Sequence, residues 1–209
     1  MGKRDAMTIE PLKPYKVLSS QPTPNPDALK FMVSRPAISS GTKSFSSEEE
    51  AQGDAFAQAM FAIPGVRSVY INHDYVSVTK SMMEDWTDMV ELIQDVIENH
   101  LEVYTSGEEV QAEKKPHDKV SITPEEFDVM NDDEKALIVD ALLDESVRPA
   151  LAADGGGLIV QAVENHIVRI HYQGACGSCP SSTEGTLRAI QGILQQSLGP
   201  EIKVHTAII

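Results

Sequence analysis

The sequence predicts an α+β protein of two small domains, each a short sheet with helices packed on one face, joined by a charged linker. Three observations lead to this fold class. Residues 103–126 are charged and lack any apolar period, which is typical of a solvated linker. On both sides, short alternating apolar runs predict strands, and longer runs with apolar residues at helical spacing predict helices. We therefore expect domains at residues 1–105 and 123–209, with the linker at 106–122.

Four short apolar runs predict the strands of the first domain. In chain order they are YKVLSS, LKFMVS, VRSVYI and YVSVTK. The first two flank the stretch QPTPNPDA, whose three prolines exclude a helix and favour extended or turn backbone. The last two are separated only by residues 72–74, so they predict a hairpin.

Two helices are predicted to cover this sheet. The first spans about residues 47–61, because Ser47 is a suitable N-cap, Glu50 follows three residues later, and the sequence IPG ends the apolar period. The second spans about residues 84–103. Its apolar residues recur at helical spacing: Trp86, Met89, Val90, Ile93, Ile97 and Leu101.

The second domain is predicted to contain a helix, two strands, a helix and a strand. These elements are residues 134–152, LIVQAV, HIVRIHY, residues 180–198 and EIKVH. Pro149 should bend the first helix near its end, and the glycines of ADGGG should stop it. Its apolar stripe is expected at Leu137, Ile138, Ala141 and Leu142. The second strand alternates, so Val168, Ile170 and Tyr172 should face the core.

The formal charge of −15 excludes several classes of function. Nucleic acids and anionic lipid surfaces are bound through Lys and Arg, so we expect no nucleic acid and no membrane among the partners. No run approaches the roughly 18 apolar residues that span a bilayer. Two cysteines make no disulfide framework, which agrees with a reducing compartment.

The first residues, MGKRDAMTIEPLKPY, contain no apolar signal core and lack the Arg-rich, acid-poor character of a transit peptide. We therefore expect a cytoplasmic bacterial protein, or a protein of the mitochondrial matrix if a presequence has been removed.

Cys176 and Cys179 are the only cysteines, and they stand in the stretch GACGSCPSST. They fall between a predicted strand and a predicted helix that begins near Pro180, where amide N–H groups and the helix dipole favour thiolate. Gly174 and Gly177 leave room for backbone to approach a bulky ligand. We expect this loop to be exposed.

Four interpretations of the two thiols remain open at this point. They can fill space in a core, form a thioredoxin-like redox pair, or bind zinc together with His166 and His171, although no second CxxC is present. They can also hold an iron-sulfur cluster. A cluster needs four thiolates, so one chain supplies half of the ligands and a two-fold homodimer would supply the rest.

Two stretches carry a resemblance to a known family. Residues 148–194, RPALAADGGGLIVQAVENHIVRIHYQGACGSCPSSTEGTLRAIQGIL, closely resemble the NifU-like C-terminal domain of Nfu iron-sulfur scaffold and carrier proteins. QPTPNPDALKFMV at 21–33 and IPGVRSVYINHDYVSVTK at 63–80 resemble the Nfu N-terminal domain. Together the two resemblances cover most of the chain.

The resemblance implies a cluster carrier and not an enzyme. It implies that Cys176 and Cys179 are the ligands of a 4Fe-4S cluster, with 2Fe-2S as the alternative, bridged between two protomers of a homodimer. The implied partners are an upstream cluster-assembly scaffold and the apo iron-sulfur acceptor proteins that receive the cluster. The N-terminal domain would recognise partners or add stability.

One departure and two further residues bear on the site. Where the family often has an acidic residue after the two glycines of Asp-Gly-Gly, this chain has Gly157, which we interpret as turn variation without effect on the site. Arg188 could neutralise cluster charge, although a surface position is the stronger expectation. A thiol-disulfide oxidoreductase that uses the CxxC pair stays as the alternative function.

Overall fold

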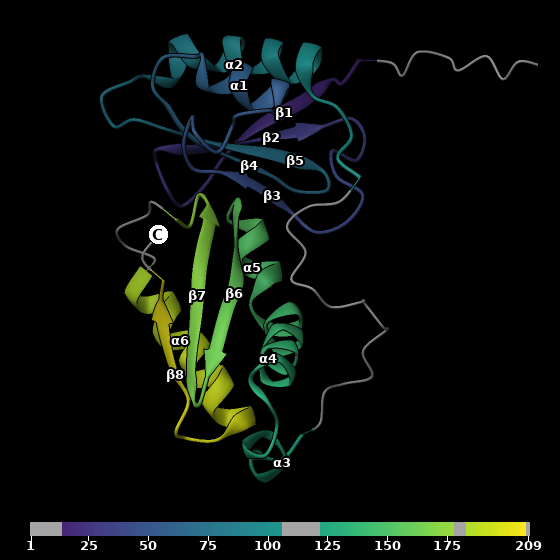
Figure 1. Cartoon of the computed structure of the whole chain (residues 1–209). Coiled ribbons are helices and arrows are strands. Elements are labelled where there is room, and N and C mark those ends of the chain that lie inside the picture. The colour runs from purple at the N-terminus through teal and green to yellow at the C-terminus, as the bar shows by residue number, and fades with distance from the viewer. Residues whose placement is uncertain (1–13, 106–121, 178–182, 208–209) are drawn as a thin grey trace, which may run out of the picture.

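The computed structural model describes residues 14–105, 122–177 and 183–207 (Figure 1). The N-terminal part contains β1 (Val17–Pro22), β2 (Ala28–Val33), β3 (Lys43–Phe45), α1 (Ala55–Phe61), β4 (Val66–Ile71), β5 (Tyr75–Lys80) and α2 (Trp86–His100). The C-terminal part contains α3 (Pro124–Asp128), α4 (Asp132–Ser146), α5 (Arg148–Ala153), β6 (Gly156–Glu164), β7 (Ile167–Gly174), α6 (Thr183–Leu198) and β8 (Lys203–Thr206). This is the predicted α+β fold class.

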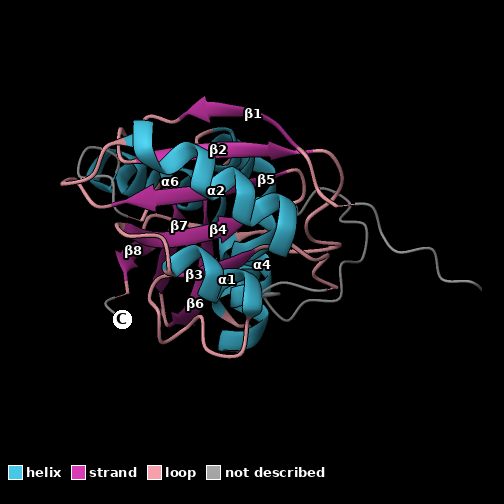
Figure 2. Ribbon diagram, turned by 90° about the horizontal axis from the view of Figure 1, so that it is seen from above, coloured by secondary structure: helices cyan, strands magenta, loops and turns pink. Residues whose placement is uncertain are grey.

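The N-terminal strands form an antiparallel sheet in the order β1-β2-β5-β4-β3. Helices α1 and α2 lie side by side over one face of it (Figures 1 and 2). Phe56, Met60, Ile93 and Ile97 from the two helices join the core beneath them. The β4–β5 hairpin begins and ends at the predicted residues.

The opposite face of this sheet is covered by the C-terminal domain. Figure 1 shows the tips of β6 and β7 meeting the sheet from the side away from the helices. All six residues of β5 are buried, including Tyr75, Ser77 and Thr79, which lie outside the apolar core under the helices. A strand buried at every position needs cover on both faces.

The C-terminal strands form a smaller sheet in the order β6-β7-β8. β6 and β7 pair antiparallel, and β8 runs parallel to β7. Along β7, Val168, Ile170 and Tyr172 are buried, whereas Arg169 is exposed, so the predicted alternation is confirmed. The buried side chains of α4, α5 and α6 join the same core, as in a sheet with helices on one face.

The predicted helix over residues 47–61 is wrong in its first half. Residues 48–53 form turns, and α1 begins only after Asp54, whose side chain accepts a hydrogen bond from the Ala57 amide. Gly53 has a φ of 89°, in the left-handed region that an α-helix excludes. The Ser47 hydroxyl still accepts from the Glu50 amide, so the predicted cap closes a turn and not a helix.

The predicted helix over residues 134–152 is two helices. The chain turns at Val147, which ends α4 and begins α5, so that Pro149 stands in the first turn of a new helix and not inside a long one. Three of the four residues of the predicted stripe pack on the core: Ala141 is buried, and Ile138 and Leu142 are partly buried against it. Leu137 is 40% exposed, and Val139 and Leu143 are fully buried.

Two elements were not predicted. β3 is only three residues long, too short to show an alternating pattern. Helix α3 begins inside the stretch 103–126 that was predicted to be solvated and extends past it; Thr123 and Glu126 form a capping box, and Phe127 is buried. The linker at 106–122 falls almost wholly outside the described residues, so the two domain boundaries stay a prediction.

In the part of the chain that the structure describes, no helix has the length and apolarity to cross a membrane.

Candidate functional site

Cys176 lies in the turn that follows β7. The strand ends at Gly174, whose φ of 61° turns the chain, and the amides of Ala175 and Gly177 donate to the carbonyls of Gly155 and Gly174 at 3.2 and 3.0 Å. The Cys176 side chain is 6% exposed and joins the C-terminal core. The expectation of an exposed loop is therefore wrong for Cys176. Cys179 and Pro180 lie outside the described residues.

Gly156 provides the space for the Cys176 sulfur. It pairs with Gly174 across the β6–β7 ladder. A Cβ atom at Gly156 would lie 2.6 Å from Cys176 Sγ and 2.6 Å from the Gln173 carbonyl oxygen, closer than atoms pack. The sequence suggested Gly174 and Gly177 as the glycines that leave room for a ligand, whereas the role of Gly156 beside the sulfur was not predicted, although the run of three glycines is visible in the sequence.

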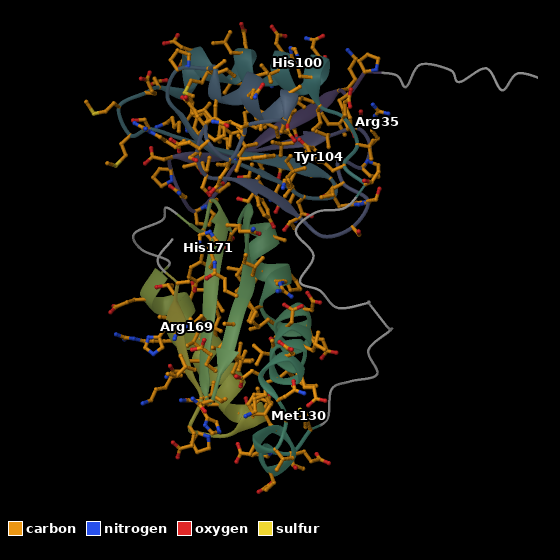
Figure 3. The ribbon with its side chains drawn as sticks, viewed as in Figure 1. Arg35, His100, Tyr104, Met130, Arg169 and His171 are labelled. Carbon is orange, nitrogen blue, oxygen red and sulfur yellow. The ribbon has the colours of Figure 1, made fainter. Side chains whose placement is uncertain are left out.

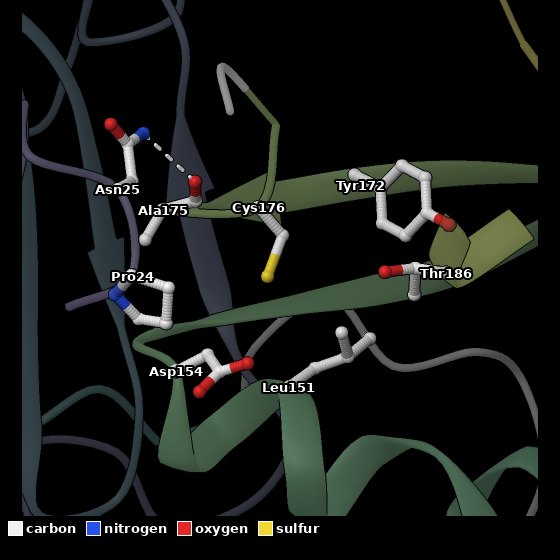
Figure 4. A pocket seen from close by; sticks show the side chains of 8 residues that line it. All are labelled: Pro24, Asn25, Leu151, Asp154, Tyr172, Ala175, Cys176 and Thr186. Carbon is white, nitrogen blue, oxygen red and sulfur yellow. Dashed lines mark hydrogen bonds between the residues drawn. The ribbon is translucent and has the colours of Figure 1, made fainter. Parts of the chain in front are cut away.

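The Cys176 side chain points into a small pocket between the two domains (Figure 4). Its lining residues are Pro24, Asn25, Leu151, Asp154, Tyr172, Ala175, Cys176 and Thr186. Pro24 and Asn25 come from the N-terminal domain, so the pocket exists only where the domains meet. Its volume of about 30 Å³ corresponds to one or two water molecules.

Polar contacts join the domains around this pocket. Asn25 Nδ2 donates to the Ala175 carbonyl oxygen at 3.0 Å, in a buried position directly before Cys176. Lys30 Nζ donates to the Ala153 carbonyl oxygen at 2.7 Å, and Thr42 Oγ1 donates to Gln173 Oε1 at 3.2 Å. The sequence around Asn25 does not indicate that this residue contacts the cysteine turn. Asn25 belongs only to the stretch QPTPNPDALKFMV that resembles the Nfu N-terminal domain.

Tyr172 supplies a protonated hydroxyl to the pocket wall. The side chain is 7% exposed, and its hydroxyl has no hydrogen-bond partner among the described residues. Burial, with a smaller effect from negative charge on Cys176, raises its pKa to about 12. The group therefore keeps its proton at neutral pH and can donate a hydrogen bond to sulfur or to water.

Comparison with known proteins assigns the chain to a family. Residues 18–104 match the family described as "Scaffold protein Nfu/NifU N terminal", and residues 139–205 match the "NifU-like domain". The human "NFU1 iron-sulfur cluster scaffold homolog, mitochondrial" is 34% identical over 190 residues, which are 90% of this chain and 70% of the human protein. This chain belongs to the Nfu family.

A second Nfu relative, the mitochondrial NFU1 homolog of Drosophila ananassae, is 31% identical over 187 residues. The match covers 89% of this chain and only 62% of the relative's length. Among solved structures, a NifU-like protein from Saccharomyces cerevisiae is 25% identical, covers 46% of this chain and 84% of its own, and has a TM-score of 0.36. That score is too low to support a conclusion about this chain.

The two histidines considered above as zinc ligands, His166 and His171, both lie on the β6–β7 hairpin. His171 and Arg169 lie along β7 (Figure 3), at positions that alternate with the core residues Ile170 and Tyr172. His166 stands at the other end of the hairpin, with Nε2 2.8 Å from Asp128 Oδ1. Within residues 14–105, 122–177 and 183–207, no group of three or more His, Cys, Asp or Glu side chains could hold a metal ion.

Arg188 is on the surface of α6. Its side chain is 79% exposed, and Nη2 lies 3.6 Å from Glu184 Oε2, one helical turn away. This is the surface position that the sequence favoured. Gly157, interpreted above as turn variation, instead stands inside β6 opposite Gln173, and a Cβ atom there would overlap the Tyr70 hydroxyl of the N-terminal domain. Its lack of a side chain is needed for the two domains to meet.

Proposed function

We propose that this chain is an iron-sulfur cluster scaffold and carrier. In this proposal two protomers hold one 4Fe-4S cluster through Cys176 and Cys179 of each, and pass it to apo-proteins. The observation that carries it is the position of Cys176 at the end of β7, in a NifU-like domain, with Gly156 leaving room for its sulfur. The names of the relatives, iron-sulfur cluster scaffold homologs, agree with this function.

The donor set of the site fits sulfur ligation. Cys176 is the only sulfur donor among the pocket's lining residues, and its neighbours there include the neutral polar side chains of Asn25, Thr186 and the protonated Tyr172. One carboxylate, Asp154, lines the pocket, which is too few for a hard cation such as Mg²⁺ or Ca²⁺. Iron-sulfur clusters are held by cysteine thiolates, and two cysteines per chain make four in a two-fold dimer.

Transfer would proceed by exchange of ligands without a change of oxidation state. A thiol of the acceptor protein forms a new iron–sulfur bond while the bond from iron to Cys176 or Cys179 breaks. The proton of the incoming thiol passes to the departing cysteine thiolate. Repeating this exchange frees the cluster from both protomers, so a dimer held by the cluster separates when the cluster leaves.

The proposed partners follow from that chemistry. They are apo iron-sulfur proteins as acceptors, an upstream scaffold as the donor, and a second copy of this chain. The relatives are named as mitochondrial proteins, which supports the mitochondrial matrix of the two compartments that the sequence suggested.

Anaerobic reconstitution with iron and sulfide tests the proposal. We expect a brown dimer with about four irons and four sulfides per two chains. Cys176→Ser and Cys179→Ser should each abolish the colour and leave a monomer. A colourless wild-type monomer that binds one zinc ion would contradict the proposal.

The same variants separate the oxidoreductase alternative. A thiol-disulfide oxidoreductase would reduce insulin in the absence of metal, and its Cys179→Ser variant would accumulate mixed disulfides on Cys176. A carrier should do neither.

A further inference from the structure

Residues 23–27, which we name the 23–27 loop, connect β1 to β2 and are shaped by their own hydrogen bonds. Thr23 Oγ1 donates to the carbonyl oxygens of Asn25 and Ala28 at 2.9 and 3.0 Å and accepts from the Asn25 amide at 3.2 Å. Asn25 Oδ1 accepts from the Asp27 amide at 3.0 Å. The loop is thus a closed turn and not an open connection.

The rest of the N-terminal domain anchors this loop. The Lys80 amide donates to the Asp27 carbonyl at 2.8 Å, and Lys80 Nζ pairs with Asp27 Oδ1 at 2.7 Å while its own side chain is almost fully buried. Trp86 Nε1 donates to the Pro26 carbonyl at 3.1 Å. The loop therefore moves as part of the domain, and its contacts to the other domain report on docking as a whole.

The 23–27 loop covers Cys176. Pro24 and Asn25 form one wall of the pocket into which the Cys176 side chain points (Figure 4), and Asn25 is bonded to the residue before it. The space for water beside the Cys176 sulfur between the docked domains is about 30 Å³, less than a cluster of eight iron and sulfur atoms needs.

Tyr70, on β4 of the N-terminal sheet, also contacts the C-terminal domain beside the cysteine turn. Its side chain is 2% exposed and contacts β6 and β7 at two glycines, Gly157 and Gly174, where a Cβ atom would meet the tyrosine. At Gly157 all three nearest atoms belong to Tyr70. A small side chain at residue 157 would therefore disturb the domain contact and little else.

We propose that the N-terminal domain is an intramolecular cap of Cys176. The 23–27 loop and Tyr70 cover the face of the C-terminal domain that carries Cys176, and a cluster held there by two protomers would need that face open. Docking of the cap and loading of the cluster then exclude each other. The second half of this inference rests on the proposed function, whereas the capping of the thiol does not.

Thiol reactivity in the metal-free full-length chain tests the cap. In a Cys179→Ser background Cys176 is the only thiol, so its reaction with a chromogenic disulfide can be followed by absorbance. We expect Gly157→Ala to accelerate the reaction about tenfold, because overpacking disfavours the docked state. Asn25→Ala should accelerate it about fivefold through loss of a buried hydrogen bond.

Two matched variants serve as controls. Gly192→Ala adds a Cβ atom in α6 where nothing lies within 4 Å, and Asn99→Ala removes an exposed asparagine that bonds only within α2. Both should react at the parent rate. Adding Tyr70→Phe to Gly157→Ala should slow the reaction again, since phenylalanine lacks the oxygen that the new methyl overlaps.

Equal rates in Gly157→Ala, Asn25→Ala and the parent would overturn the cap, as would equal acceleration by the two controls. No iron is present in this experiment. A chain that never bound a cluster could still show a capped thiol, and a genuine carrier could fail the test, so the two proposals stand or fall separately.

Discussion

At Gly156 one missing methyl group decides where a sulfur atom can lie. The Cβ atom of an alanine would meet Cys176 Sγ at 2.6 Å and the Cys176 amide nitrogen at 2.8 Å, and backbone cannot yield as a flexible side chain can. We expect Gly156→Ala to lower the free energy of unfolding by about 1–3 kcal/mol in urea and to lower the iron bound after reconstitution. Gly192→Ala, with no neighbour within 4 Å, should do neither. Unchanged stability in Gly156→Ala would contradict the assigned role.

The hydroxyl groups of Tyr172 and Tyr15 differ in their hydrogen bonding. The Tyr172 hydroxyl has no partner among the described residues, while Tyr15 Oη donates to the Pro36 carbonyl at 2.7 Å. Removing an unpaired buried hydroxyl changes the free energy of unfolding little, whereas removing a hydrogen-bonded one lowers it by about 1 kcal/mol. Tyr15→Phe should therefore destabilise the chain more than Tyr172→Phe in urea unfolding. The reverse order would show that Tyr172 has a partner that matters.

Tyr70 should make the chain sensitive to alkali. Burial raises its pKa from 10 to about 12, with a smaller contribution from negative charge on Cys176. A raised pKa stabilises the fold fully below pH 10, and this stabilisation is lost as the pH rises toward 12. A shift of two units in the pKa corresponds to about 2–3 kcal/mol of the free energy of unfolding. Between pH 9 and 12, Tyr70→Phe should lose less stability than the wild-type chain by about that amount, and parallel losses would contradict the assignment.

At the scale of the element, Arg148 joins α4 to β6, an edge strand of the smaller sheet. Its guanidinium pairs with Asp140 and with Asp144, the latter at 2.7 Å, and Nε donates to the Leu158 carbonyl at 3.2 Å. Burial alone would lower the pKa of Arg148, but the two aspartates outweigh it and raise the pKa. The break at Val147 places Arg148 where it can reach both helix and strand.

Removing this cation should be costly because Asp140 is only 8% exposed. Arg148→Met leaves a nearly buried carboxylate without its partner, and we expect a loss of about 3 kcal/mol in the free energy of unfolding. Arg169→Met removes a pair with Glu164 in which both side chains are about half exposed, so it should cost less than about 1 kcal/mol. Similar losses in urea unfolding of the two variants would argue against a structural role of Arg148.

Elements with a local signal were predictable, and those set by single backbone angles were not. The β4–β5 hairpin was predicted to the residue because its apolar alternation and its short polar turn agree. Helix α1 was predicted too long, because Ser47 and Glu50 satisfy a capping pattern that Gly53 then overrides with a left-handed angle. The position of Cys176 after a strand was foreseen, whereas the sequence did not show that Pro24 and Asn25, about 150 positions away along the chain, line the pocket around its sulfur.

At the scale of the whole molecule, the arrangement of the two domains had no local signature. The contacts that fix it join Asn25 to Ala175 and Thr42 to Gln173, and they are polar groups that in isolation suit a solvated surface. The sequence suggested two independent units with the cysteine loop exposed. The structure instead gives them a common buried face, so that the domain without cysteines controls access to the one cysteine that the structure describes.

The proposed cap and the proposed bridging cluster together predict that uncapping strengthens cluster binding. If only a fraction of chains is undocked, the apparent dissociation constant for the cluster is the intrinsic one divided by that fraction. Because two protomers hold one cluster, both must undock, so raising the undocked fraction about tenfold should tighten apparent binding by at least that factor and at most by its square. We expect reconstituted Gly157→Ala to need more iron chelator than the wild-type dimer for half-removal of iron, and Gly192→Ala to match the wild type. Because Gly157 contacts Tyr70 and not Cys176, the gain must come through the domain contact. Equal chelator concentrations at half-removal for Gly157→Ala and the wild type would contradict this prediction. They would show that docking of the N-terminal domain does not weaken cluster binding.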